Sequence, residues 1–301
     1  MFDKVVEKLT EKVVRIEDRV REELSRKENE KIKEYLRKEK LIITFSPKWK
    51  IPASILYWTL TAFKTHQYPP ILAPYSSFIT HIAPYHEQYS VIALIDNINI
   101  LKPMFDFRRL LKIDTFILSE NLPKQMKLLD TMEIRFEGGF FEKNIAWSLY
   151  LSILTLKSLA NEVRTKRVEN LLKEITNVGE VVEDMCGKFR REIEHLAKVL
   201  SENVETYVLA PDYLLSVIEG FLKDYVNVRV YDISSVYSMS DMFKNNVVVV
   251  RTGVEEHMGR YIRFKLGFGN VHEIVVNVDP VSAPLYLMII IEASKEIARN
   301  M

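Results

Sequence analysis

The chain has 301 residues, of which 48% are hydrophobic and 28% are charged, a composition typical of a soluble globular protein. Lysine and arginine total 42 against 41 aspartates and glutamates, so no excess positive charge directs the chain to nucleic acid or to an acidic membrane. The single cysteine, Cys186, excludes an internal disulfide framework and a cysteine-rich metal site. We therefore expect no nucleic-acid partner.

No charged-then-apolar signal peptide opens the chain, and its longest apolar run, residues 283–291, is too short to cross a bilayer. We expect a cytoplasmic protein with no membrane partner. Many lysines, glutamates and isoleucines beside only three glutamines would suit a thermophile.

Residues 1–39 form a predicted N-terminal helical segment. Apolar residues recur there with the spacing of one helix face, at Val5, Leu9, Val13, Ile16, Val20 and Leu24. This stripe packs either on the protein's own body or on a partner helix. The many charges between its members indicate a solvated face.

Residues 40–141 form the first predicted α/β domain. Its predicted strands are residues 41–45, 90–95, 114–118 and 131–136, and its predicted helices are residues 51–63 and a segment from Pro103 through Leu111. Strands that alternate with helices favour a mostly parallel sheet with helices on both faces.

Gly138 and Gly139 mark the turn into a predicted helical crossover, residues 142–203, with helices at 145–159, 168–175 and 181–200. Residues 204–301 form the second predicted α/β domain. Its predicted strands are residues 206–210, 226–231, 247–250 and 273–278, and its helices start at Pro211, near residue 254 and at Pro280.

The two predicted domains repeat one order of elements. The strand and helix at residues 41–45 and 51–63 correspond to those at 206–210 and 213–221. A second strand and helix, 90–95 and 104–111, correspond to 247–250 and 256–266. This order indicates an α/β fold of two similar parallel-sheet halves that arose by internal duplication.

Ligands of open parallel sheets bind at the carboxyl ends of the strands, here the loops 46–54, 96–102, 211–213 and 252–255. Phosphate-binding loops generally need glycine, and the two loops of the first half contain none. The chain has neither a G-x-G-x-x-G nor a Walker pattern. A nucleotide-binding domain is disfavoured, and we expect no cofactor.

Metal ligands and nucleophiles are equally hard to find. The only close histidine pair, His81 and His86, lies in a proline-flanked loop, so we expect no metal site. Cys186 lies in an amphipathic helical pattern and suits a packing role. Ser46 lacks the G-x-S-x-G setting of a hydrolase nucleophile.

The order of elements, with two local segments, resembles the double sugar isomerase (SIS) domain family, which includes the isomerase half of glucosamine-6-phosphate synthase (glutamine–fructose-6-phosphate aminotransferase). Residues 217–223 read V-I-E-G-F-L-K, similar to the family's A-L-E-G-A-L-K helix. Residues 278–286 read V-D-P-V-S-A-P-L-Y and are similar to the P-L-L-Y start of its last helix. The resemblance implies two flavodoxin-like, three-layer α/β/α halves, a phosphosugar ligand and a homodimer.

The family's signature loops are degenerate here. S-P-K-W-K at residues 46–50 replaces a glycine–serine/threonine run, and I-D-N-I-N-I at 95–100 replaces the phosphate-holding S-x-S-G-x-T. Residues 235–243 lack the histidine and glycine of E-x-K-H-G-P, and Asp224 stands near the place of the catalytic glutamate.

These departures leave three functions open, and whether the chain is an enzyme is not decided. It is a degenerate double-SIS protein that binds a phosphosugar or related carbohydrate derivative, an active phosphosugar isomerase with rearranged residues, or a structural or regulatory dimer module. Isomerisation needs a base between C1 and C2. Asp224, Glu219 and His257 are alternatives for it, so the catalytic residues stay unknown.

We expect the ligand over the strand ends of the first half. There the chain offers two ammonium groups, hydroxyls and amides near helix N-termini, at Ser46, Lys48, Lys50, Ser54, Asn97 and Asn99. Asp96 in the opposite loop disfavours phosphate and favours a neutral hydroxyl. The apolar first and last helices predict a homodimer.

Overall fold

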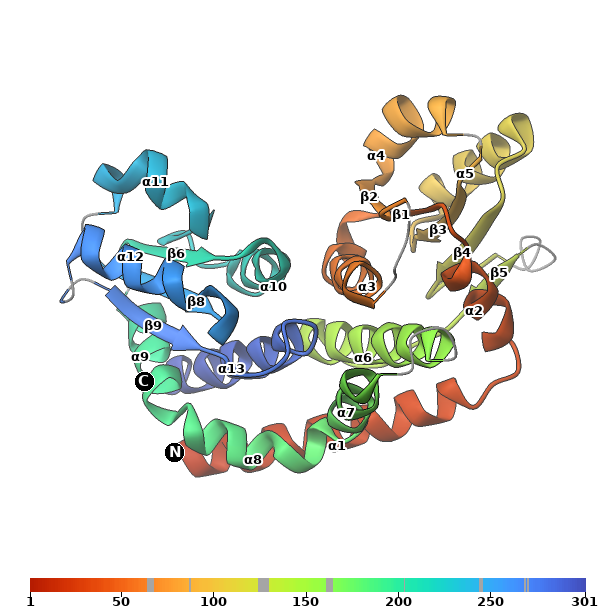
Figure 1. The fold of residues 1–301 in the computed structure, drawn as a ribbon. Helices are drawn as coiled ribbons and strands as arrows, with labels where there is room; N and C mark the ends of the chain where they lie inside the picture. The colour runs from red at the N-terminus through yellow and green to blue at the C-terminus, as the bar shows by residue number, and fades with distance from the viewer. Residues whose placement is uncertain are drawn as a thin grey trace. The chain divides into compact units, whose positions relative to one another are not determined.

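The computed structural model describes residues 1–63, 68–86, 88–123, 130–160, 165–202, 204–243, 246–267, 269 and 271–301. The chain divides into two compact units (Figure 1). The first-sheet unit is residues 16–176. The second-sheet unit is residues 1–15 with 177–301. Helix α1 (Phe2–Leu24) therefore contributes its first half to one unit and its second half to the other.

A five-stranded parallel sheet forms the first-sheet unit, in the order β2-β1-β3-β4-β5. Its strands are β1 (Leu41–Phe45), β2 (Ile71–Pro74), β3 (Ser90–Leu94), β4 (Thr115–Ser119) and β5 (Thr131–Glu133). Strands β1, β3 and β4 are buried along their whole length, as expected where helices cover both faces.

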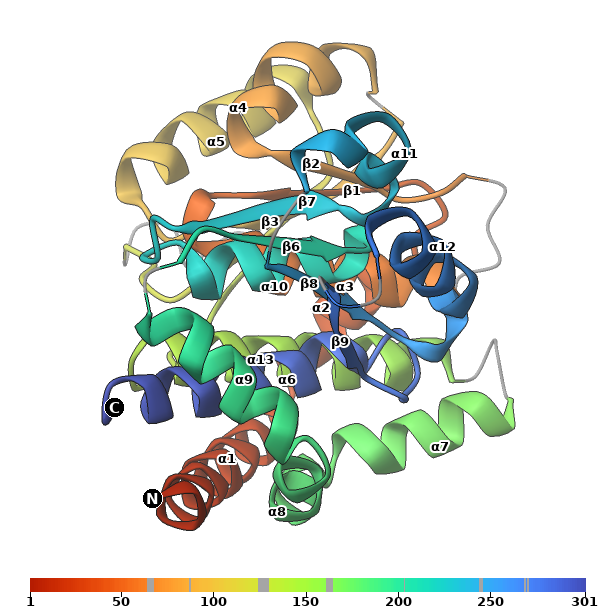
Figure 2. The ribbon, with the colours of Figure 1, turned by 90° about the vertical axis from the view of Figure 1, so that its left-hand side faces the viewer.

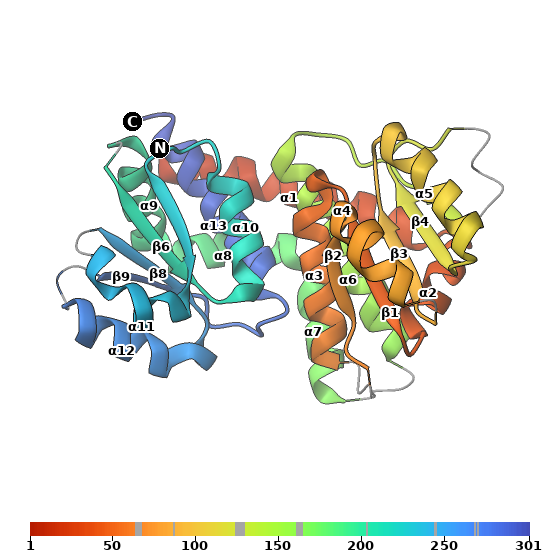
Figure 3. The ribbon, with the colours of Figure 1, turned by 90° about the horizontal axis from the view of Figure 1, so that it is seen from above.

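Helices cover both faces of this sheet. The helices of this unit are α2 (Asn29–Arg37), α3 (Lys50–Phe63), α4 (Tyr75–Ser77), α5 (Ile98–Leu111), α6 (Phe140–Leu159) and α7 (Lys166–Ile175), with one-turn segments at Pro47–Trp49, Phe78–Ile82 and Ala83–Tyr85. Leu101 and Met104 of α5 pack with Val91 and Ala93 of β3 on one face. Helix α3 contacts β1 and β2 and packs against α6 (Figure 3).

A four-stranded parallel sheet forms the second-sheet unit, in the order β7-β6-β8-β9. Its strands are β6 (Thr206–Ala210), β7 (Val228–Asp232), β8 (Val247–Arg251) and β9 (Val271–Val275). Its helices are α8 (Val178–Lys188), α9 (Arg190–Ser201), α10 (Asp212–Leu222), α11 (Val236–Met239), α12 (Glu256–Leu266) and α13 (Ala283–Ala298), with one-turn segments at Ile233–Ser235, Ser240–Met242 and Gly253–Glu255.

Helix α13 is the core helix of the second-sheet unit. Nearly all of its residues are buried, and it packs against α9 and α10 (Figure 2). An apolar segment of this length therefore finds its partners inside the unit. None of the helices within the described residues is long and apolar enough to span a membrane.

The two parallel sheets confirm the predicted fold class, but three helix boundaries differ from the prediction. The N-terminal segment is broken after Leu24 and resumes at Asn29. Pro103 lies inside α5, because Asn97 caps that helix one turn earlier than predicted. Residues 181–200 form two helices that meet at Phe189. Of the crossover helices, α6 and α7 belong to the first-sheet unit and α8 and α9 to the second.

Candidate functional site

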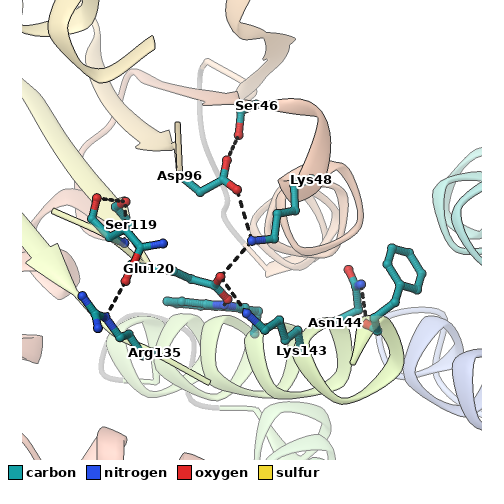
Figure 4. A network of polar contacts seen from close by, with 11 residues as sticks. Ser46, Lys48, Asp96, Ser119, Glu120, Arg135, Lys143 and Asn144 are labelled. Atoms are coloured by element: carbon teal, nitrogen blue, oxygen red, sulfur yellow. Dashed lines mark hydrogen bonds and ion pairs between the residues drawn. The ribbon is translucent and has the colours of Figure 1, made fainter. Parts of the chain in front are cut away.

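Polar side chains gather at the carboxyl ends of three neighbouring strands of the first sheet. Ser46 directly follows β1, Asp96 lies two residues after β3, and Glu120 directly follows β4. The parallel register places these ends side by side. Together with Lys48 and Lys143 they form what we call the carboxyl-edge site (Figure 4). This edge is where open parallel sheets bind ligands.

Asp96 connects the loop after β3 to the loop after β1. The Ser46 hydroxyl donates to Asp96 Oδ1 at 2.8 Å, and Lys48 Nζ lies 3.2 Å from Asp96 Oδ2. Lys48 extends from a one-turn helix at Pro47–Trp49, whose proline fixes the start of the turn. The Asp96 carboxylate therefore closes the gap between β1 and β3, the point where the strand order reverses.

Glu120 is the centre of the site. Its side chain is only 6% exposed. Its Oε2 accepts from Lys48 Nζ at 2.9 Å and from Lys143 Nζ at 3.0 Å, and its Oε1 accepts from Trp147 Nε1 at 3.0 Å. Lys143 and Trp147 lie four residues apart on one face of α6, which is why both reach the same carboxylate.

The ionisation of Glu120 and Lys48 is fixed by this pairing. Burial raises the pKa of Glu120, but hydrogen bonds from Lys48, Trp147 and Lys143 outweigh it, so its pKa lies below the ordinary 4.5. Burial lowers the pKa of Lys48, but the bonds to Glu120 and Asp96 outweigh it and raise that pKa above 10.5. Both groups are charged at neutral pH.

A small cavity of about 50 Å³ adjoins the charged pair. Its lining combines aromatic and polar residues: Lys48, Trp49, Pro52, Glu120, Phe140, Lys143, Asn144 and Trp147. The rings of Trp49 and Trp147 pack with centroids 4.3 Å apart. Trp49 is 2% exposed, and its Nε1–H has no hydrogen-bond partner among the described residues. The cavity is much smaller than most ligand pockets, which usually exceed about 300 Å³.

The six predicted binding residues occupy different places. Ser46 and Lys48 belong to the carboxyl-edge site. Lys50 is exposed at the first position of α3, and Ser54 is buried within that helix. Asn97 and Asn99 are exposed at the start of α5, where the Asn97 side chain accepts the Asn99 N–H at 2.9 Å.

Sequence reasoning missed Glu120, Lys143 and Trp147. Glu120 could have been found, because an acidic residue directly after a buried strand belongs to the carboxyl edge of the sheet. Lys143 and Trp147 could not, since they come from α6, whose position beside this edge depends on tertiary packing against α3.

The carboxyl edge of the second sheet is bridged in a similar way. Tyr213 at the start of α10 donates to Glu255 Oε1 at 2.9 Å and lies 3.1 Å from the Thr252 hydroxyl. Glu255 Oε2 accepts from the Thr252 N–H at 2.9 Å and from its hydroxyl at 2.7 Å. Next to them, Asp212 lies two residues after β6, and Asp232 is the last residue of the adjacent strand β7. Burial and then the neighbouring Asp232 raise the pKa of Asp212.

The residues considered for catalysis all lie in the second-sheet unit. Glu219 is half-buried in α10, Asp224 is exposed just after that helix, and His257 is exposed in the first turn of α12. Within the described parts of the chain, no three histidine, cysteine or acidic side chains form a group that could hold a metal ion.

No family model matches the sequence, and no curated protein matches it. Solved structures do match the fold. A candidate phosphosugar isomerase from Clostridium difficile 630 superimposes with a TM-score of 0.70 at 13% identity, over 98% of this chain and 93% of the other.

Two further solved structures have the same arrangement over nearly their whole length. The C-terminal domain of glucosamine-fructose-6-phosphate aminotransferase from Francisella tularensis matches with a TM-score of 0.65 at 13% identity, over 99% of this chain and 94% of that one. Tagatose-6-phosphate ketose/aldose isomerase from Escherichia coli matches with a TM-score of 0.62 at 11% identity, over 100% and 92%. The chain thus has the SIS-like fold that its sequence resemblance predicts.

Proposed function

We propose that the protein binds a carbohydrate derivative at the carboxyl-edge site and does not isomerise it. The observation that carries this proposal is the position of the charged network. Ser46, Lys48 and Asp96 lie at the ends of β1 and β3, the two strands that flank the reversal of strand order, and Glu120 lies at the end of the neighbouring strand β4. The similar solved structures are named for sugar phosphates, which supports a carbohydrate ligand.

The ionisation of the site supports binding without isomerisation. Proton transfer between neighbouring sugar carbons is most efficient when the base has a pKa near the working pH. The pKa of Glu120 is lowered and that of Lys48 is raised, so both move away from neutrality. Glu120 Oε2 is also occupied by two ammonium groups.

The experiment is titration calorimetry with fructose, glucosamine and their 6-phosphates on the wild type, Lys48→Met and Lys50→Ala. We expect one of these sugars to bind, Lys48→Met to weaken it at least tenfold, and Lys50→Ala to leave it within twofold. An NMR assay for conversion of the bound sugar should show none. Absence of binding by all four compounds would overturn the proposal, and turnover would show the active isomerase instead.

A structural or regulatory dimer module is the second candidate, because the cavity at the site is small and its charges are already paired. A groove between the start of α1 and the end of α13 supports the dimer-module function. That groove measures about 410 Å³ and combines apolar Val5 and Leu9 with Lys4 and Lys8.

We propose a homodimer in either case, in keeping with the frequency of twofold pairing. Light scattering at tens of micromolar checks it, and a monomer contradicts it. From the balance of 42 basic and 41 acidic residues we also propose that the protein works without nucleic acid. A cytoplasmic location remains a proposal.

A further inference from the structure

The side-chain donors of the carboxyl-edge site already have acceptors within the protein. Lys48 lies between Asp96 at 3.2 Å and Glu120 at 2.9 Å, and Lys143 also binds Glu120. The Ser46 hydroxyl donates to Asp96. A phosphate at this edge would have to compete with a carboxylate for each of these donors.

Backbone N–H groups at the same edge are used in the same way. The Ser46 N–H donates to Leu94 O at 3.0 Å, and the Trp49 N–H donates to Ser46 O at 2.8 Å. At the start of α5 the Asn99 N–H donates to the Asn97 side chain, and the next two N–H groups donate to Asn97 O at 2.9 Å. The helix N-terminus, ordinarily an anion site, is therefore capped by the protein's own oxygen atoms.

The charges at the edge balance. Lys48 and Lys143 contribute two positive charges, and Asp96 and Glu120 contribute two negative ones. The buried Glu120 carboxylate depends on both lysines for compensation. A phosphate group that drew Lys48 away would leave Glu120 less compensated in a buried position, which opposes phosphate binding.

A hydroxyl group suits the same surroundings. It donates to a carboxylate and accepts from an ammonium group or from an indole N–H, whereas a phosphate dianion only accepts. The 50 Å³ cavity beside Glu120 could admit one small substituent, and the buried Trp49 N–H in its wall is a donor without a partner among the described residues.

We propose that the carboxyl-edge site selects an unphosphorylated sugar or polyol and that Asp96 and Glu120 exclude phosphate by occupying its donors. This proposal rests on the proposed function and names its ligand class. The sugar lies over the strand ends of β1 and β3, with one hydroxyl-bearing substituent in the cavity that Trp49, Glu120 and Trp147 line.

The test measures exclusion and its reversal. Calorimetry at low salt compares fructose, glucosamine, their 6-phosphates and inorganic phosphate on the wild type, Asp96→Asn and Glu120→Gln. The wild type should bind an unphosphorylated sugar at least tenfold more tightly than its 6-phosphate. Each variant keeps the size of the side chain but frees lysine charge, and should gain at least tenfold in affinity for inorganic phosphate and the 6-phosphates.

Asp106→Asn is the matched control, because it removes one negative charge from an exposed position of α5 and should leave phosphate affinity within twofold. Circular dichroism checks that each variant folds. If Glu120→Gln does not fold, Asp96→Asn alone still tests the proposal. Wild-type binding of a 6-phosphate as tight as that of the parent sugar would overturn the exclusion alone. Binding of none of the sugars by the wild type would overturn the proposed function and this inference with it.

Discussion

The carboxyl edges of the two sheets share one type of hydrogen bond and differ in their charged side chains. In each, a hydroxyl group donates to a carboxylate across the two strands that flank the reversal of strand order: Ser46 to Asp96 in the first sheet and Tyr213 to Glu255 in the second. The first edge adds two lysines and a buried glutamate. The second adds the carboxyl pair Asp212 and Asp232.

The carboxylates of the two edges therefore hold different parts of the structure together. A carboxylate that caps its own loop, as Glu255 does, stabilises the start of a helix. Glu120 instead binds Lys48 from the turn after β1 and both Lys143 and Trp147 from α6. We therefore expect the first edge to tolerate the loss of its partners less well than the second.

The largest effect is expected from removing both lysines of the first edge. Lys48→Ala/Lys143→Ala leaves Glu120 buried with only the Trp147 N–H, and breaking such a buried pair should lower the free energy of unfolding by about 3 kcal/mol at pH 7. Urea unfolding measures it. The exposed pair Lys50→Ala/Lys102→Ala is the control and should change stability by less than about 0.5 kcal/mol. Equal losses in both variants would contradict a central role for Glu120.

A smaller effect is expected at the second edge. Glu255→Ala removes the reciprocal bonds with Thr252 and the bond from Tyr213, and the loss of a helix cap typically costs about 1–2 kcal/mol. The same urea experiment measures it. A larger loss of unfolding free energy in Glu255→Ala than in the double lysine variant would contradict the expectation that the first edge is the more sensitive one.

The bridging hydroxyls give a direct comparison of the two edges. Ser46→Ala and Tyr213→Phe each remove a hydroxyl that donates to a carboxylate, at a cost of about 1 kcal/mol. We expect the Ser46 variant to lose more, because Ser46 is buried and Tyr213 is half-buried. Thermal unfolding of the two variants side by side measures the difference, and a larger loss for Tyr213→Phe would count against it.

The sequence was sufficient for the fold but not for the site. Apolar runs located the inner strands of both sheets, since buried parallel strands such as residues 41–45 and 247–250 are near-continuous apolar runs. Strand β2 was not predicted. The loops after β1 and β3 followed from the rule that ligands bind at strand ends. The partners of Lys48 did not, because a lysine in a loop looks available until α6 and the end of β4 bring Lys143 and Glu120 beside it. The helix break at Phe189 was missed although Gly187 lies two residues before it, because the apolar spacing continues across the break.

The smallest expected effect is the opposite pH response of the two edges. The folded-state pKa of Glu120 is lowered, so its stabilising contribution is complete above the unfolded value of 4.5 and is lost as the pH falls through the folded pKa. The folded-state pKa of Asp212 is raised, so the folded state favours the protonated form. The contribution of Asp212 to stability is complete below pH 3.8, its unfolded pKa, and is lost as the pH rises through its folded-state pKa. Asp212→Asn should therefore raise the urea midpoint slightly at pH 7 and lose that advantage at pH 3. Glu120→Gln should lower the midpoint at pH 7 and lower it less at pH 3. Parallel shifts of both variants at the two pH values would show that the carboxyl groups of the two edges do not differ in this way.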